Sequence, residues 1–428
     1  MHWIALHPRD DTPEGRQLLA WRMLGYTPRV ALVEEAVLME VQSCLRLWGG
    51  LKRLLARISE QKSAPAPARQ AQGASSLIAL ARLRLPPAQN PDTPPHALPL
   101  ATLSAARPHL PVLARLGCRT WGDLRALPRA GVARRLGADL LAALDQAEGR
   151  APDIHAWEQL PERFDEALEL PVLATTTAEL HPALEHLLLR LQVWLTARVL
   201  GASAIALHWR FDQRRLNGAE LPPGAALDIR TAQPVQGMAH LRRLIDEHLA
   251  RTPLAAPVNR LGLRTLQLAP WQGQAAGLLP GEQGRGEALH ELVERLSARL
   301  GPTQVLMAQP HADHRPERMQ RWVPAQQVLA QAQRAAPPCT ALPLAPTWLL
   351  ATPQPLTTQD ERPQWQGRAL ARLTPAQRIE TGWWEEAHAP PRRDYFIAQA
   401  PGQGLVWIYR EQNPGDATPR WYLHGLYA

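Results

Sequence analysis

The first 60 residues alternate between strand-like and helix-like patterns of apolar positions. Residues 1–9 are typical of a first strand, and residues 28–50 contain two apolar runs that form a hairpin. Residues 51–61 carry leucine or isoleucine at i, i+3, i+4 and i+7, which is one face of a helix, and residues 15–25 have a shorter helical stripe. The pattern predicts a small sheet with helices packed on it.

The next 90 residues favour helices. A helix is predicted from about Ser75, and five prolines in residues 86–95 then predict a hinge. Residues 113–124 are typical of a helix, a glycine turn and a new helix that is capped by Thr120, with Asp123 completing a capping box. We interpret this segment as a helix-hairpin-helix motif.

The remainder of the chain alternates between ordered and irregular patterns. Long amphipathic helices are predicted at residues 182–200 and 236–251, and half-exposed strands at 204–211 and 258–266. Residues 326–368 are rich in Ala, Pro and Gln, which is typical of a linker. The tail contains four apolar, aromatic stretches that are predicted to be strands, at 378–384, 393–397, 405–411 and 421–428.

The charge indicates a polyanionic partner. The formal net charge is +8, and among the 47 basic residues only Lys52 and Lys62 are lysine. Guanidinium groups offer planar, bidentate donors to phosphate, which favours nucleic acid. A GC-rich coding sequence would also produce many arginines. The positions of the arginines along the chain must therefore decide whether they bind nucleic acid.

Cysteine usage and the N-terminus favour a cytoplasmic protein. Cys44, Cys118 and Cys339 lie far apart, with neither metal-binding nor disulfide spacing. The N-terminus lacks the pattern of a signal peptide, and no apolar run is long enough to span a membrane.

The hairpin carries the resemblance to a known family. It has Glu34 and Glu35 at its turn and ends in Leu-Arg-Leu-Trp-Gly-Gly at residues 45–50. It resembles the second palm motif of the Y-family (translesion) DNA polymerases, and more closely the ImuB branch, which is regarded as non-catalytic.

The resemblance implies an α+β multidomain chain: a degenerate palm that lacks fingers, a helix-hairpin-helix thumb, a little-finger α/β domain and a small β-rich C-terminal region. The expected boundaries are 1–95 for the palm, 96–155 for the thumb, 163–310 for the little finger, 311–368 for a Pro/Gln-rich linker and 369–428 for a partner-binding region.

Two observations predict that no DNA polymerase activity remains. Two-metal catalysis needs several carboxylates around ions roughly 3.5–4 Å apart, but His7 and Arg9 stand where first-strand aspartates are expected, and Asp10 and Asp11 belong to a polar turn. Only about 20 residues separate the first strand from the hairpin, too few for fingers. We therefore interpret Glu34 and Glu35 as vestigial and expect no metal, cofactor or catalytic residue.

The resemblance also implies contacts with DNA primer-template through the thumb and the little finger. Glycine lets the backbone of the hairpin approach a phosphate closely, and arginines surround it. The candidate DNA-binding residues are Gly117, Arg119, Thr120, Arg125, Arg129, Arg134 and Arg135 in the thumb and Arg210, Arg214 and Arg215 in the little finger.

The tail resembles the region that recruits partners in the ImuB branch. The resemblance implies an ImuA-like protein, an error-prone C-family DNA polymerase and the replication sliding clamp as partners, expression in the SOS response to DNA damage, and mutagenic translesion synthesis as the outcome. The candidate partner-binding residues are Trp383, Trp384, Tyr395, Trp407, Tyr409 and Trp421, most of which would also suit the core of a small sheet. Leu342 and Leu344 are the nearest match to a clamp-binding motif.

Two alternatives stay open. One is a residual DNA polymerase that uses Glu34 and Glu35, and the other is a structure-specific helix-hairpin-helix module that only binds DNA. The His311, Asp313 and His314 cluster is interpreted as a loop and not as a metal site, since no helix fixes its spacing. Motifs of serine hydrolases, NTPases and dehydrogenases do not occur after any predicted strand.

Overall fold

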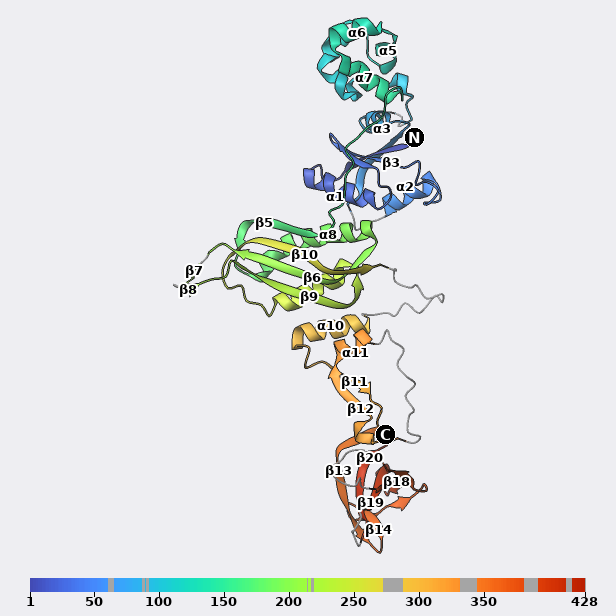
Figure 1. The fold of residues 1–428 in the computed structure, drawn as a ribbon, viewed down its shortest axis with the longest axis vertical. Helices are drawn as coiled ribbons and strands as arrows, with labels where there is room; N and C mark the ends of the chain where they lie inside the picture. The colour runs from blue at the N-terminus through green and yellow to red at the C-terminus, as the bar shows by residue number, and fades with distance from the viewer. Residues whose placement is uncertain are drawn as a thin grey trace. The chain divides into compact units, whose positions relative to one another are not determined.

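The computed structural model describes residues 1–428 except 61–64, 87–88, 90–91, 214, 217–218, 272–287, 332–344, 381–391, 413–417 and 428. The chain divides into two compact units, Met1–Glu287 and Ala288–Ala428 (Figure 1). None of the helices in the described part is long and apolar enough to cross a lipid bilayer.

Residues 3–83, which we call the palm region after the domain expected there, contain an antiparallel sheet of order β2-β3-β1-β4. Its elements are β1 (Trp3–Pro8), α1 (Pro13–Leu24), β2 (Val30–Val33), β3 (Ala36–Glu40), α2 (Leu51–Glu60), β4 (Pro67–Gly73) and α3 (Ser76–Leu83). The predicted hairpin and the three predicted helices are confirmed. Strand β4 was not predicted, because this polar edge strand lacks an apolar alternation.

Both faces of the palm sheet are covered. Ile4, Leu6 and Met39 pack with residues of α1 and α2 in one cluster. Trp3, Ala5 and Leu38 point the other way and pack with residues of α3. Successive residues of a strand face opposite sides, so β1 contributes to both clusters and lies at the centre of the palm region.

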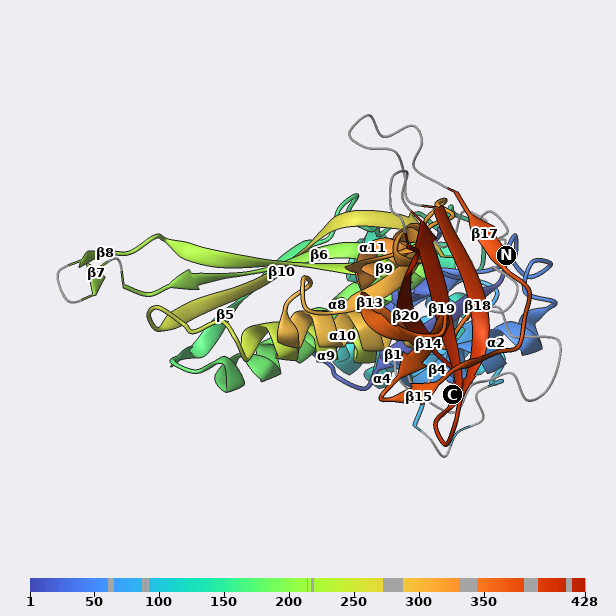
Figure 2. The same ribbon diagram turned by 90° about the horizontal axis from the view of Figure 1, so that it is seen from below.

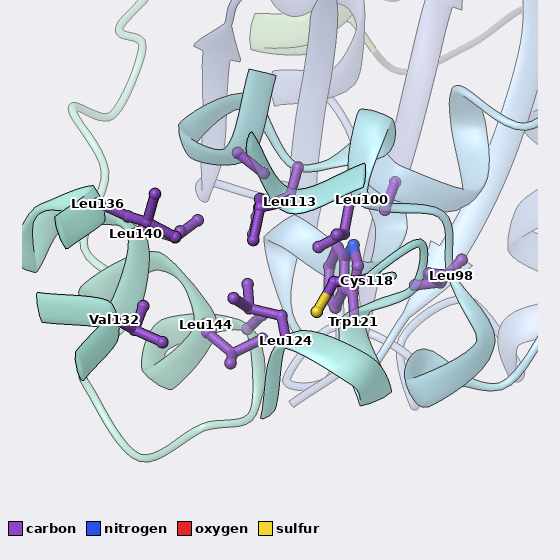
Figure 3. Packing of buried hydrophobic residues seen from close by; sticks show 14 of the residues in the cluster. Leu98, Leu100, Leu113, Cys118, Trp121, Leu124, Val132, Leu136, Leu140 and Leu144 are labelled. Carbon is purple, nitrogen blue, oxygen red and sulfur yellow. The ribbon is translucent and has the colours of Figure 1, made fainter. Parts of the chain in front are cut away.

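Residues 95–147, which we call the thumb region after the domain expected there, are helical. Its elements are η1 (Pro95–Ala97), η2 (Leu100–Thr102), η3 (Ser104–His109), α4 (Leu110–Arg115), α5 (Trp121–Ala126), α6 (Arg129–Leu136) and α7 (Ala138–Ala147). Figure 3 shows how Leu113, Trp121 and Leu144 from different helices meet in one apolar cluster. The predicted capping box is confirmed, because the Thr120 hydroxyl accepts from the Asp123 amide and the Asp123 carboxylate accepts from the Thr120 amide.

The segment after α7 attaches the thumb region to the palm region. The Asp153 carboxylate accepts from the amide and hydroxyl of Ser76 at the start of α3, at 2.8 and 2.5 Å, and from the Gln146 side chain at 2.9 Å. The ring of Trp157 stacks on that of Trp3, with centroids 6.1 Å apart. The exit from the thumb region is therefore fastened to the palm sheet.

Residues 165–270, which we call the little-finger region after the domain expected there, contain a four-stranded antiparallel sheet of order β5-β10-β6-β9. Its elements are β5 (Asp165–Ala174), η4 (Thr177–Leu180), α8 (His181–Arg198), β6 (Leu200–Phe211), β7 (Arg215–Leu216), β8 (Ala219–Glu220), β9 (Gly224–Val235), α9 (Met238–Leu249) and β10 (Val258–Pro270). Figure 2 shows α8 and α9 on one side of the sheet. The expected four strands and two helices are therefore present, although only two of the strands had been located from the sequence.

The second unit begins with a small helical and hairpin segment and continues into a larger sheet. Its elements are α10 (Leu289–Leu300), β11 (Leu306–Pro310), η5 (Pro316–Arg318), β12 (Gln320–Pro324), α11 (Ala325–Gln331), β13 (Trp348–Gln359), β14 (Arg362–Trp365), β15 (Arg368–Ala369), β16 (Ala371–Arg372), β17 (Gln377–Ile379), β18 (Arg392–Ala400), β19 (Gly404–Gln412) and β20 (Arg420–Leu426). The sheet has the order β15-β14-β13-β20-β19-β18-β16, and β17 pairs with β18.

Two expected boundaries differ from the structure. Residues 311–368 were expected to be a linker, but β13 and β14 lie in this range and pair into the C-terminal sheet. The range expected for the little finger ends at 310, whereas α10 already belongs to the second unit. The proline-rich composition concealed β13, whose long-range partner β20 lies about 70 residues further along the chain.

Candidate nucleic-acid interface and vestigial carboxylate pair

Glu34 and Glu35 form the turn between β2 and β3, and an arginine holds both. The Arg84 guanidinium donates to Glu35 from Nε at 2.6 Å and from Nη2 at 3.0 Å, and Nη2 also lies 2.8 Å from Glu34 Oε2. Arg107 Nη1 lies 3.4 Å from the same Glu34 oxygen. The hydrogen bond from Arg84 is the main reason that the pKa of Glu35 lies below its usual value.

Arg84 also connects the hairpin to the thumb region. It follows the last residue of α3, and its side chain is 10% exposed. Its Nη1 donates to the Thr102 carbonyl at 2.7 Å and to the Ser104 hydroxyl at 2.8 Å. We call Arg84, Glu34 and Glu35 the carboxylate clasp. Neither Arg84 nor Arg107 was found from the sequence, because Arg84 and its acidic partners lie 49 and 50 residues apart and no local pattern links them.

The end of β1 adds no further carboxylate to the clasp. His7 is the last residue but one of the strand, and its Nδ1 lies 2.8 Å from the Pro8 carbonyl. Asp10 and Asp11 lie in the exposed bend beyond β1, which confirms their interpretation as loop residues. Across the described ranges, the structure contains no group of three or more His, Cys, Asp or Glu side chains placed to hold a metal ion. A two-metal centre does not fit these residues, because cationic guanidinium groups occupy the carboxylate oxygens that metal ions would need.

The thumb hairpin presents an open glycine turn. Gly117 has φ +77, which favours glycine, and a side chain there would meet no atom within 4 Å. Arg119 is exposed beside it, and Thr120 caps the following helix. The turn backbone is therefore accessible to a ligand.

The remaining thumb arginines differ in their surroundings. Arg129 pairs with Asp145 at 2.6 Å, and Arg125 lies 3.6 Å from Glu148. Arg134 and Arg135, in the last turn of α6, are exposed. Arg134 and Arg135 are therefore more accessible to a phosphate than Arg125 and Arg129, which already have acidic neighbours.

The little-finger sheet has an open face opposite α8 and α9. The strand register places three rows of side chains across this face. The first row is Glu169, Arg260, Arg210 and Gly224; the second is Ala167, Gly262, His208 and Ala226; the third is Asp165, Arg264, Ala206 and Asp228. Arg210 was predicted as a contact, Arg215 is exposed in β7, and Arg214 lies outside the described residues.

The middle row forms a trough between two charged rows. Arg260 and Arg264 are four residues apart on β10, which corresponds to about 13 Å along the strand. The ring of His208 lies over Gly262, where an added Cβ would come within 2.1 Å of its Nε2. A hollow of about 540 Å³ opens here, and its lining includes Arg210, Arg260, Asp165, Ala167 and His208. Burial is the main reason that the pKa of His208 lies below its usual value.

Arg210 and Arg260 are directly opposite each other in the register. Like charges in this position repel across neighbouring strands. Glu169 is the acidic neighbour of both: it is opposite Arg260 on β5, and its Oε1 lies 3.8 Å from Arg210 Nη2. One carboxylate beside two guanidinium groups leaves an excess positive charge, which an anionic ligand can neutralise.

The predicted partner-binding aromatics are mostly internal. Tyr395, Trp407 and Tyr409 pack together on one face of the C-terminal sheet, and Trp421 packs on the other. All four are less than 5% exposed, so their prediction as direct contacts is wrong for the folded sheet. Trp383, Trp384, Leu342 and Leu344 lie outside the described residues.

The His311, Asp313 and His314 segment has an internal partner for its carboxylate. Arg315 grips Asp313 with Nε at 3.0 Å and Nη2 at 2.7 Å. This hydrogen-bonded contact is the main reason that the pKa of Asp313 is lowered to about 2. The carboxylate stabilises the turn between β11 and β12.

Comparison with known proteins gives one relationship over the full length. No family model matches the chain. Protein ImuB from two strains of Caulobacter vibrioides, NA1000 / CB15N and ATCC 19089 / CIP 103742 / CB 15, is 26% identical over 452 residues, covering 98% of this chain and 94% of the relative.

Similar solved structures include a Dbh ternary complex, at 11% identity and a TM-score of 0.26, covering 62% of this chain and 98% of that one. DinB from Sulfolobus solfataricus is similar at 12% identity and a TM-score of 0.24, covering 59% and 77%. The match to ImuB, and not these partial likenesses, decides the relationship. The chain is therefore an ImuB homologue over nearly the whole of its sequence.

Proposed function

We propose that this chain is a non-catalytic, polymerase-like scaffold that holds damaged primer-template DNA and recruits an error-prone C-family DNA polymerase. The observation that carries this proposal is the carboxylate clasp, in which Arg84 occupies both carboxylates of the palm hairpin. The relationship to ImuB supports it. The role would belong to SOS-induced DNA repair and mutagenic translesion synthesis.

Primer extension tests the absence of catalysis. The purified protein is expected to bind a primer-template, as measured by fluorescence anisotropy, and to add no nucleotide with Mg²⁺ or Mn²⁺. Binding is expected because arginines are exposed in both the thumb region and the little-finger region. An active Y-family polymerase serves as the positive control. Extension that disappears in Glu34→Ala/Glu35→Ala would establish a residual polymerase and refute the scaffold.

We propose that the trough binds one sugar-phosphate backbone of the DNA. The backbone would run across the strands of the sheet and not parallel to them. The floor of the trough consists of Ala167, Ala226 and the His208 ring, which lies over Gly262. Arg210 and Arg260 on one side provide positive charge for phosphates, whereas Arg264 on the other side shares its row with Asp165 and Asp228. The exposed Gly117 turn and Arg134 would add contacts from the thumb region.

Removing the charge beside the trough is expected to weaken binding at low salt. Arg210→Ala/Arg260→Ala should reduce affinity about tenfold and flatten the plot of log K against log salt by roughly one for each phosphate that the protein no longer neutralises. Anisotropy titrations over several salt concentrations measure both effects. Arg242→Ala is the matched control, because Arg242 is 47% exposed on α9, on the helix-covered side.

Filling the trough tests its shape without a change in charge. Ala226→Leu places a large side chain on the open face and should weaken binding, because Ala226 is opposite His208. Ala225→Leu is its control, since the adjacent residue is also exposed but is opposite Trp209 on the other face. If Ala226→Leu and Ala225→Leu change the DNA affinity equally, the trough is not the binding site for the DNA backbone.

The second unit is the proposed site of recruitment for an ImuA-like protein, the C-family polymerase and the sliding clamp. A chain that ends at Glu287 should keep its DNA binding and lose these partners in pull-downs with purified proteins. The division between compact units determines this cut, because truncation at 368 would separate β13 and β14 from their sheet. Partner binding by the shortened chain would contradict the assignment.

A further inference from the structure

Helix α1 of the palm region packs against helix α8 of the little-finger region within the first compact unit. Trp21 on α1 is 4% exposed, and the Arg190 guanidinium of α8 lies 4.9 Å from the centre of its ring. Arg190 also pairs with Glu166 of β5 at 3.1 Å, and its side chain is only 11% exposed. The Arg190 guanidinium is thus enclosed between an indole ring of the palm region and a carboxylate of the little-finger region.

The end of α1 lies close to α8. A Cβ added to Gly25 would lie 3.3 Å from Ala197 Cα and 3.8 Å from Ala197 Cβ. Gly25 has φ −69, so the backbone does not require a glycine there. The missing side chain instead allows α8 to approach, and a large residue at this position would force the two helices apart.

The connecting segment is fastened on both sides of this contact. On the palm side, the Glu158 amide donates to the Val30 carbonyl at 2.8 Å. On the little-finger side, the Pro161 carbonyl accepts from Trp194 Nε1 at 2.9 Å and from Arg198 Nη2 at 2.7 Å. Only Gln159 and Leu160 lie between these two anchored residues, and the Leu160 carbonyl also accepts from Arg198 Nη2 at 3.2 Å.

We propose that α8 is permanently docked on α1, so that the palm and little-finger regions form one rigid body that binds DNA without a domain movement. The DNA-binding part of this inference rests on the proposed function. The docking itself does not, because it concerns the free protein. In this proposal, α1 is the surface of the palm region on which the little-finger region docks.

A disulfide between Gly25→Cys and Ala197→Cys tests the docking. The Cβ separation of 3.8 Å matches the mean of about 3.8 Å in disulfides. Cys44→Ser and Cys339→Ser remove two native thiols, and each single cysteine variant is a control. The expected result is a nearly complete cross-link under mild oxidation, observed as a mobility shift that dithiothreitol reverses. Failure to cross-link, with both thiols still reactive towards maleimide, would overturn the docking.

The oxidised and reduced forms then test the absence of movement. A rigid body should bind primer-template with affinities that differ by less than about twofold between the two forms. Loss of binding on oxidation, restored by dithiothreitol, would overturn the inference. If the parent protein does not bind DNA at all, the DNA-binding part of the proposed function is wrong. The yield of the cross-link still tests the docking in that case.

Arg190→Ala in the cross-linking background tests the interaction that holds the helices together. The rate of disulfide formation should fall severalfold, since an alanine on α8 reaches neither Trp21 nor Glu166. Arg57→Ala is the matched control, because Arg57 makes a similar contact with Trp48, 5.4 Å from the ring centre, inside the palm region. An equal rate in both variants would overturn the role of Arg190.

Discussion

Arg84→Ala is expected to lower the free energy of unfolding by about 2–3 kcal/mol, which is below the range for a fully buried pair because Glu34 and Glu35 are partly exposed. The substitution leaves two adjacent carboxylates without their shared cation, and it removes the donors to Thr102 and Ser104. Urea unfolding followed by tryptophan fluorescence measures the change. Arg84→Lys is the informative comparison, because it keeps the charge but not the bidentate geometry.

The same variant should expose the carboxylates to cations. Without Arg84, Mn²⁺ is expected to bind weakly at Glu34 and Glu35, and a titration followed by electron paramagnetic resonance can detect it. Arg84→Ala/Glu35→Ala should abolish that binding. Polymerase activity should not appear, since β1 supplies no third carboxylate. A variant that is as stable as the parent and binds no Mn²⁺ would show that the clasp does not hold the pair.

Asp153→Asn is expected to lower the free energy of unfolding by about 3 kcal/mol, because the carboxylate is buried and accepts several hydrogen bonds. An asparagine retains one acceptor oxygen and adds a donor, which would face the Ser76 amide or Gln146. Unfolding can be followed by tryptophan fluorescence, to which Trp3, Trp121 and Trp157 of the thumb and palm regions contribute. Asp139→Asn, at an exposed position on α7, is the control.

The effect of Asp153 should depend on pH in a defined direction. The pKa of this carboxyl is lowered to about 2, because its hydrogen bonds from His155, Ser76 and Gln146 outweigh the opposing effect of burial. Its contribution to stability is therefore complete above the unfolded value of about 3.9 and is lost as the pH falls towards 2. The difference in stability between the parent and Asp153→Asn should shrink over that range. A constant difference would contradict the assigned role.

Local patterns in the sequence predicted local structure well. The hairpin around Glu34, the helix that starts after Ser75 and the capping box of Thr120 each depend on residues that are close in sequence, and the structure confirms them. The resemblance also anticipated an α/β region with four strands and two helices. These features needed no knowledge of distant contacts.

The remaining features depend on contacts between distant residues. No local sequence pattern distinguishes Arg84 from other arginines near the end of a helix, because its partners lie some 50 residues away. The trough exists only when β5, β10, β6 and β9 are in register, so Gly262 and Ala226 had no recognisable signal. Tyr395 and Trp407 were expected at a binding surface, but the pairing of β18 with β19 and β20 places them inside the sheet.

The carboxylate clasp ties any metal chemistry at the palm hairpin to the loss of a stabilising contact. A lineage that regained a catalytic palm would first have to lose Arg84, and this step removes a connection between the hairpin and the thumb region before any benefit appears. New carboxylates on β1 would have to arise while the protein was less stable, and marginal stability leaves little room for such intermediates. For the scaffold that we propose, selection on stability alone would therefore retain Arg84 and its contacts with the carboxylate pair.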